Sequence, residues 1–86
     1  MLTIAEVDGA RIMIFSFDHD PPRVHAFGAD FRVKLTISDA RVVETRGAVG
    51  PAVMRRLRQW VLRHRARLGQ LWSDAMRGNP ISRIED

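Results

Sequence analysis

The chain has 86 residues, of which 45% are hydrophobic, and a formal net charge of +4 at pH 7. This hydrophobic fraction excludes a disordered tail, and the lack of cysteine excludes disulfides and thiolate metal sites. No apolar run approaches the roughly 20 residues that span a bilayer. Because acidic Glu6 and Asp8 stand where a signal peptide would be basic and then apolar, we expect a cytoplasmic protein with no membrane segment.

The first residues predict a β-hairpin. Residues 2–7 and 10–16 favour strands, and Asp8-Gly9 between them is a strong signal for a two-residue hairpin turn. In the second strand apolar side chains point to both sides, which predicts a central strand covered on both faces. Residues 23–27 form a short third strand.

The most regular alternation in the chain lies in residues 31–37. The positions predicted to face the core are Phe31, Val33, Leu35 and Ile37. Between them, Arg32, Lys34 and Thr36 are predicted to face water. This pattern indicates a strand with one buried face.

A fifth strand and a linker precede the helical half. Ser38-Asp39-Ala40 predicts a hairpin turn, and residues 41–45 predict an edge strand. Residues 46–50 contain two glycines and are predicted to form the linker.

The remaining chain predicts one long helix or two shorter ones. Pro51 suits a first helical turn, apolar residues recur at steps of three and four, and Gly78-Asn79-Pro80 is a typical stop. A straight helix over residues 51–77 would be about 40 Å long, whereas a globule of this size is roughly 30 Å across. We therefore favour a kink near residues 64–69, caused by Gly69, over an overhang or packing on a second copy.

These elements predict one α+β domain over residues 1–86. Its first part, residues 1–46, is a small antiparallel β-sheet of about four to five strands. Its second part, residues 51–78, is a helical half packed on one face of that sheet.

Residues 17–25, FDHDPPRVH, concentrate the groups able to do chemistry. His19 and His25 near Arg23 suit phosphodiester cleavage, with histidine as acid or base and arginine holding a phosphate. The structural interpretation is a rigid turn, because the two prolines fix two φ angles and the polar side chains satisfy the local backbone.

A metal site is a second interpretation of the histidines. If the protein bound a metal, its ligands would be His19, His25 and His64 with an aspartate. The spacing matches no standard metal signature, so we expect no cofactor. The alternative for His64 is a hydrogen-bonded core residue on the apolar side of the helix.

Basic side chains border the apolar side of the helical half. Residues 51–86 hold eight basic and three acidic side chains, against six and seven in residues 1–50. At 100° per residue, two edges of the apolar face carry Arg56, Arg58, Arg63, Arg65 and Arg67. These arginines are candidate contacts to nucleic-acid phosphates, and the alternative is a solvated face whose long side chains cover the core.

Trp60 and Trp72 lie on opposite borders of the apolar face. Either they close the core, or they help to bind another protein or a second copy of the chain. Because a second copy would also accommodate an overlong helix, we expect a homo-oligomer.

Two groups of residues resemble a known family. Asp18, His19, Pro21, Pro22 and His25 match a D-H-x-P-P-H-x-H motif. Trp60, His64, Trp72, Gly78 and Pro80 match a helical half with two tryptophans and a glycine-containing stop. Together they resemble the bacterial family called domain of unknown function 4160 over nearly the whole chain. Arg23 stands where that pattern has a histidine, which favours phosphate or carboxylate recognition over a metal cluster.

The resemblance implies a small prokaryotic protein, often encoded beside a member of the family called domain of unknown function 2442. We therefore predict a binding or regulatory component of a two-gene, toxin–antitoxin-like module, acting through a small protein partner and phosphate contacts on nucleic acid. The alternative is a small histidine-dependent RNase or metal-dependent hydrolase that uses His19, His25 and Arg23.

Overall fold

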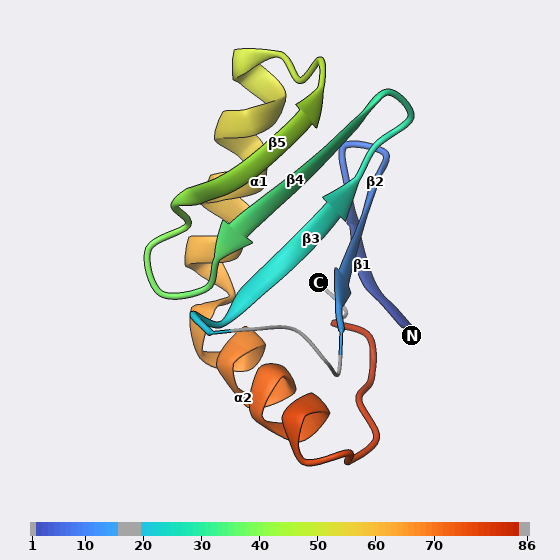
Figure 1. Ribbon diagram of the computed structural model, residues 1–86, viewed down its shortest axis with the longest axis vertical. Helices are drawn as coiled ribbons and strands as arrows, with labels where there is room; N and C mark the ends of the chain where they lie inside the picture. Colours follow the sequence, from blue (N-terminus) through green and yellow to red (C-terminus); the bar gives the residue numbers. More distant parts are fainter. Residues whose placement is uncertain (1, 16–19, 85–86) are drawn as a thin grey trace.

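The computed structural model describes residues 2–15 and 20–84, and it is an α+β fold as predicted (Figure 1). The strands are β1 (Leu2–Val7), β2 (Ala10–Ile14), β3 (Arg23–Phe27), β4 (Phe31–Thr36) and β5 (Val42–Gly47). They form one antiparallel sheet in the order β1-β2-β3-β4-β5. The helices α1 (Pro51–Arg63) and α2 (Arg65–Met76) lie behind one face of this sheet. We call the face turned away from the helices the outer face.

The β1–β2 hairpin turns at the predicted residues. Asp8 and Gly9 both have positive φ angles, 51° and 79°, as a tight two-residue turn requires. The register of β1 shifts between Thr3 and Ala5, and both Ile4 and Ala5 are buried. A β-bulge of this kind explains why the sequence of β1 does not alternate cleanly.

The β4 alternation is confirmed with one exception. Val33 and Leu35 are buried in the core, but Thr36, predicted to face water, is also buried. Its hydroxyl donates to the carboxylate of Asp39 and accepts the backbone N–H of Arg41 at 2.9 Å. Thr36 therefore closes the turn that leads into β5.

β5 extends two residues beyond the predicted strand, to Gly47. Gly47 has a φ of 79°, and a Cβ atom at this position would meet the backbone of Asp30. The next residue, Ala48, donates its N–H to the Asp30 carbonyl oxygen at 3.3 Å. Glycine at this position therefore lets β5 lie against the turn before β4.

The helical half breaks at His64, which separates α1 from α2. A break between residues 64 and 69 was predicted, but Gly69, its supposed cause, lies inside α2. Instead His64 leaves helical geometry (φ −106°, ψ 19°), and its Nδ1 lies 2.9 Å from the Trp60 carbonyl oxygen. The break lets both helices bury apolar residues in one core. No overlong helix remains to be covered, so helix length is no longer a reason to expect a second copy of the chain.

The core lies between the sheet and the helices. Trp60 and Trp72 are both buried there, so they close the core. α2 ends as predicted, because Gly78 has a φ of 74° and Asn79 donates its N–H to the Asp74 carbonyl oxygen at 2.8 Å. Beyond it, the Ile84 N–H donates to the Ile4 carbonyl oxygen at 2.7 Å, which holds the tail against β1.

Candidate functional site

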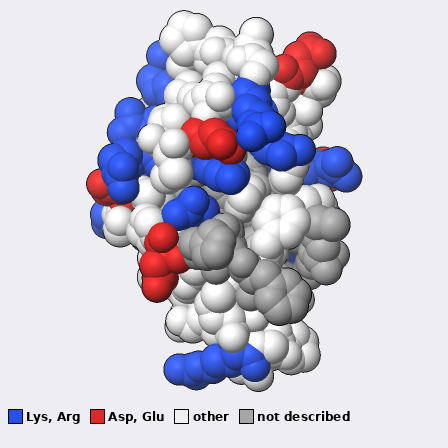
Figure 2. All heavy atoms as spheres, viewed as in Figure 1, with Lys and Arg blue, Asp and Glu red and all other residues white. Residues whose placement is uncertain are grey.

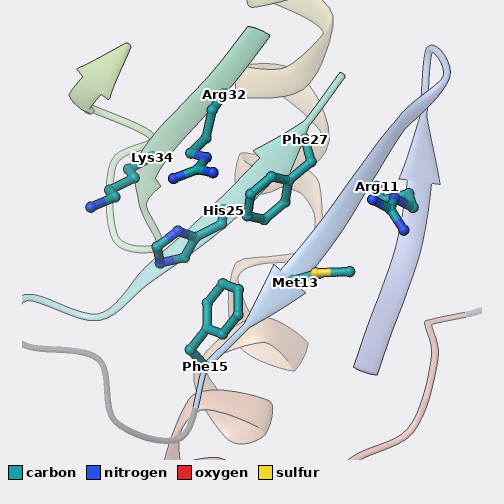
Figure 3. A pocket seen from close by; sticks show the side chains of 7 residues that line it. All are labelled: Arg11, Met13, Phe15, His25, Phe27, Arg32 and Lys34. Atoms are coloured by element: carbon teal, nitrogen blue, oxygen red, sulfur yellow. The ribbon is translucent and has the colours of Figure 1, made fainter. Parts of the chain in front are cut away.

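The outer face of the sheet contains a hollow of about 490 Å³ (Figure 3). Its lining comes from β2 and the residue that follows it, from β3 and from β4: Arg11, Met13, Phe15, His25, Phe27, Arg32 and Lys34. Three of these side chains are basic, three carry aromatic rings, and none is acidic. The site thus combines positive charge with flat apolar surfaces.

Strand pairing brings these residues together. In one row across the sheet, Arg11 of β2 lies opposite Phe27 of β3, which lies opposite Arg32 of β4. In the next row, Met13 lies opposite His25, which lies opposite Lys34. Because alternate residues of a strand share a face, both rows point outward while the residues between them enter the core.

The aromatic rings form the floor of the hollow. Phe15 meets the His25 ring edge-on, with centroids 4.6 Å apart and an angle of 82°. The rings of His25 and Phe27 are nearly parallel, at 11°, with centroids 6.2 Å apart. His25 is only 7% exposed, whereas Phe15 and Phe27 are half-buried. The two phenylalanines therefore present ring surface to a ligand and fix the histidine between them.

The basic side chains stand around this floor (Figure 3). The Arg32 Cζ lies 4.9 Å from the centre of the Phe27 ring, within the range of a cation–π contact. The Lys34 Nζ lies 3.2 Å from a carboxylate oxygen of Glu44, and its hydrogen bond lowers the pKa of that carboxyl. Figure 2 views the molecule onto the outer face and shows basic side chains gathered over the sheet, with acidic groups between them.

A second hollow of about 340 Å³ adjoins the first and shares Phe27 and Arg32 with it. It reaches the edge of the sheet, where Asp30 and Arg46 contribute to its lining. The two hollows together can hold a ligand longer than one aromatic group.

The predicted catalytic residues are only partly brought together. Arg23 and His25 share the outer face of β3, two residues apart, but His19 lies outside the described residues. The Arg23 guanidinium donates to the carbonyl oxygens of Pro21 at 3.1 Å and Asp20 at 3.2 Å. Arg23 therefore stabilises the turn before β3, as in the rigid-turn interpretation.

The predicted metal ligands do not converge within the described part of the chain. His25 lies on the outer face, whereas His64 lies at the junction of α1 and α2, with its ring 4.6 Å from that of Trp60. The sheet separates the two. Across residues 2–15 and 20–84, no three metal-ligating side chains cluster closely enough to hold an ion.

The arginines predicted to contact nucleic acid serve several separate contacts. Arg56 pairs with Asp8 of the first hairpin. Arg58 donates to the Ala40 carbonyl oxygen at 2.9 Å, and Arg65 to that of Ser38 at 3.4 Å.

The other two predicted arginines, Arg67 and Arg63, differ in their contacts. Arg67 donates to the Ser82 hydroxyl at 3.0 Å. Arg63 is exposed at the end of α1. Four of the five thus tie the helices to turns of the sheet or to the tail.

Sequence reasoning placed several lining residues on strands without recognising the hollow. The sequence does contain a signal, because basic, aromatic and methionine residues occupy every second position of two predicted strands. These positions are Arg11, Met13 and Phe15 in one strand and Arg23, His25 and Phe27 in the next. Aligning these outward positions needs the strand register, which the sequence does not state.

Comparison with known proteins gives a family assignment. Neither the curated proteins nor the solved structures include a significant match. In the described part of the chain, neither helix is long and apolar enough to cross a membrane. The model of the family described as Domain of unknown function (DUF4160) matches residues 9–73, which include the whole lining of the larger hollow and most of the helical half. The chain therefore belongs to the DUF4160 family.

Proposed function

We propose that this protein binds single-stranded nucleic acid on the outer face of its sheet. The observation that carries the proposal is the hollow that Arg11, Arg32 and Lys34 surround and that Phe15 and Phe27 floor. Unstacked bases pack on aromatic side chains, and arginine and lysine contact the phosphates between them. A ligand that is both flat and anionic matches both halves of this lining.

The chemistry favours single strands over duplexes. In a duplex the base faces are already stacked on one another, so Phe15 and Phe27 gain no partner there. An extended strand can stack one base on the Phe27 ring by displacing the Arg32 guanidinium, which then contacts a phosphate, and can continue into the neighbouring hollow. Base stacking on an aromatic residue contributes about 1–3 kcal/mol per base.

The experiment compares two substitutions at one position. Phe27→Tyr keeps a flat ring and Phe27→Leu removes it, while both keep a large apolar side chain against His25. Binding of a labelled single-stranded oligonucleotide is measured by fluorescence anisotropy. We expect the leucine variant to bind about 5- to 150-fold more weakly than the tyrosine variant, from the energy of one stacked base.

Control measurements test whether the loss of affinity is specific to the outer face. Leu62→Ala removes an exposed apolar side chain from α1 and should leave the affinity unchanged. Circular dichroism checks that each variant is folded. Equal affinity of the two Phe27 variants, or equal binding of single strands and duplexes, would contradict the proposal.

In this proposal the protein is the nucleic-acid-binding component of the two-gene, toxin–antitoxin-like module that the sequence suggested. The expected partner, a member of the family called domain of unknown function 2442, is tested separately by co-expression and co-purification. The RNase alternative is tested with the same oligonucleotide in RNA form. We expect it to stay intact on a gel with both the wild-type protein and His25→Ala, and cleavage lost only in the variant would favour the enzyme.

A further inference from the structure

β5 lies at the edge of the sheet, and its side chains are unusually accessible. Within the described residues its backbone pairs with β4 alone. Val42 and Val43 are 39% and 37% exposed, although both are large apolar residues. An edge strand presents unpaired N–H and C=O groups, which are a template for pairing with another strand.

The ladder between β4 and β5 determines which backbone groups point away from the sheet. The Ala48 N–H donates to the Asp30 carbonyl oxygen, so these two residues form a hydrogen-bonded pair. Hydrogen-bonded and non-hydrogen-bonded pairs alternate along an antiparallel ladder. Glu44 and Arg46 therefore direct their backbone groups toward β4, and Thr45 directs its own outward.

The side chains next to Thr45 carry opposite charges. Glu44 lies opposite Lys34, and Arg46 lies opposite Arg32, so both point to the outer face. If two copies of β5 pair antiparallel about Thr45, Glu44 of each copy lies opposite Arg46 of the other. Opposite charges directly across two strands stabilise their pairing.

We propose that the protein forms a two-fold symmetric dimer in which the β5 strands of two copies pair about Thr45. The outward N–H and C=O groups of Thr45 then bond those of the second copy, and two Glu44–Arg46 pairs flank them on the outer face. The register shift opposite Val43 limits the regular ladder to the few residues around Thr45, so the dimer is weak and reversible.

This dimer has a consequence for the outer face. Antiparallel pairing about an axis perpendicular to the sheet keeps the outer faces of both copies on the same side. The two five-stranded sheets become one continuous sheet, and its outer face carries two copies of the basic and aromatic hollow. One single strand is then able to contact both hollows, which raises its effective affinity.

The test uses the symmetry of the charges and contains no nucleic acid, so it does not depend on the proposed function. In the Arg46→Glu variant, the new glutamate of each copy lies opposite Glu44 of the other copy. The dimer therefore contains two pairs of facing negative charges, one on each side of its axis. Within one copy the substitution removes the exposed 3.8 Å contact of Arg46 with Glu44, but it places the new glutamate opposite Arg32, so the fold should be retained. Sedimentation equilibrium should show self-association at least about tenfold weaker than that of the wild type.

Glu44→Arg is the complementary variant, because it places positive charges opposite each other at the same axis. Each variant alone should be largely monomeric at concentrations where the wild type dimerises. Mixed together, they should form a heterodimer, because every facing pair across the axis is then of opposite charge. This rescue is specific to pairing about Thr45.

A third variant covers the case in which Glu44→Arg misfolds beside Lys34. Thr45→Pro removes the outward N–H, and edge strands tolerate proline at such a position. With an unchanged circular dichroism spectrum, it should also be monomeric. A wild-type protein that stays monomeric over a roughly hundredfold concentration range, dimerisation that Arg46→Glu leaves unchanged, or folded charge variants that fail to associate when mixed would each overturn the proposal.

Discussion

The salt dependence of nucleic-acid binding distinguishes two possible binding surfaces, the outer face of the sheet and the arginines of the helices. Three basic side chains, Arg11, Arg32 and Lys34, line the larger hollow. On a single strand each neutralised phosphate contributes about −0.7 to the slope of log affinity against log salt, so three contacts give about −2. Between 50 and 200 mM salt, the affinity should then fall by about twentyfold.

The assay is fluorescence anisotropy with one labelled oligonucleotide at several salt concentrations. Arg32→Gln removes one phosphate contact, so the slope should become less steep by about 0.7. Arg63→Gln is the matched control, since it makes the same chemical change at an exposed position on α1. Its slope should equal that of the wild type.

Two results would refute the reasoning. If Arg63→Gln flattens the slope while Arg32→Gln does not, the strand lies on the helices and the outer face is not the binding surface. If the wild-type affinity does not change with salt, the basic side chains of the hollow make no phosphate contacts.

The remaining predictions concern stability, measured by urea unfolding. Thr36→Val should cost about 1–2 kcal/mol, because the buried Thr36 hydroxyl, which bonds both the Asp39 carboxylate and the Arg41 N–H, is lost. The Thr36 hydroxyl lowers the pKa of Asp39 below its ordinary 3.8, so the ionised carboxylate stabilises the fold above that pH and stops doing so as acid protonates it. The deficit of the variant should therefore shrink below pH 3.8, and an unchanged deficit there would contradict this account. Gly47→Ala should cost at least about 2 kcal/mol, since φ is positive and the new methyl group meets Asp30, whereas Gly69→Ala should add about 0.5–1 kcal/mol by favouring α2. A stable Gly47→Ala protein would mean that this turn is not held as described.

The elements of this fold that the sequence predicted are those with local causes. Asp8 and Gly9 form the first turn because both adopt the positive φ angles that a type I′ two-residue hairpin turn needs. Pro51 begins α1 and Gly78 ends α2 because each suits the backbone geometry of a helix terminus. Residues close together in the sequence are therefore enough to predict these turns and helix ends.

Two details of the sequence prediction were wrong: the exposure of Thr36, and the cause, though not the position, of the helix break. Thr36 reads as a surface residue of an alternating strand, yet the turn that follows buries its hydroxyl against Asp39. Gly69 has the lowest intrinsic preference for helix in its segment, yet the break occurs at His64. Packing of both helices on one core outweighed that local preference.

The candidate site depends on tertiary structure in the same way. The sequence indicated basic residues, aromatic residues and histidines, but not which of them meet. Strand register places Arg11, Phe27 and Arg32 side by side, and the two-sided sheet keeps His25 away from His64. Residues in separate strands become neighbours only through cross-strand pairing, and shifting a strand by one residue would turn its outward side chains into the core. The sequence by itself therefore determined the turns, the helix ends and the fold class, while the register of the folded sheet decided where the hollow lies and which residues line it.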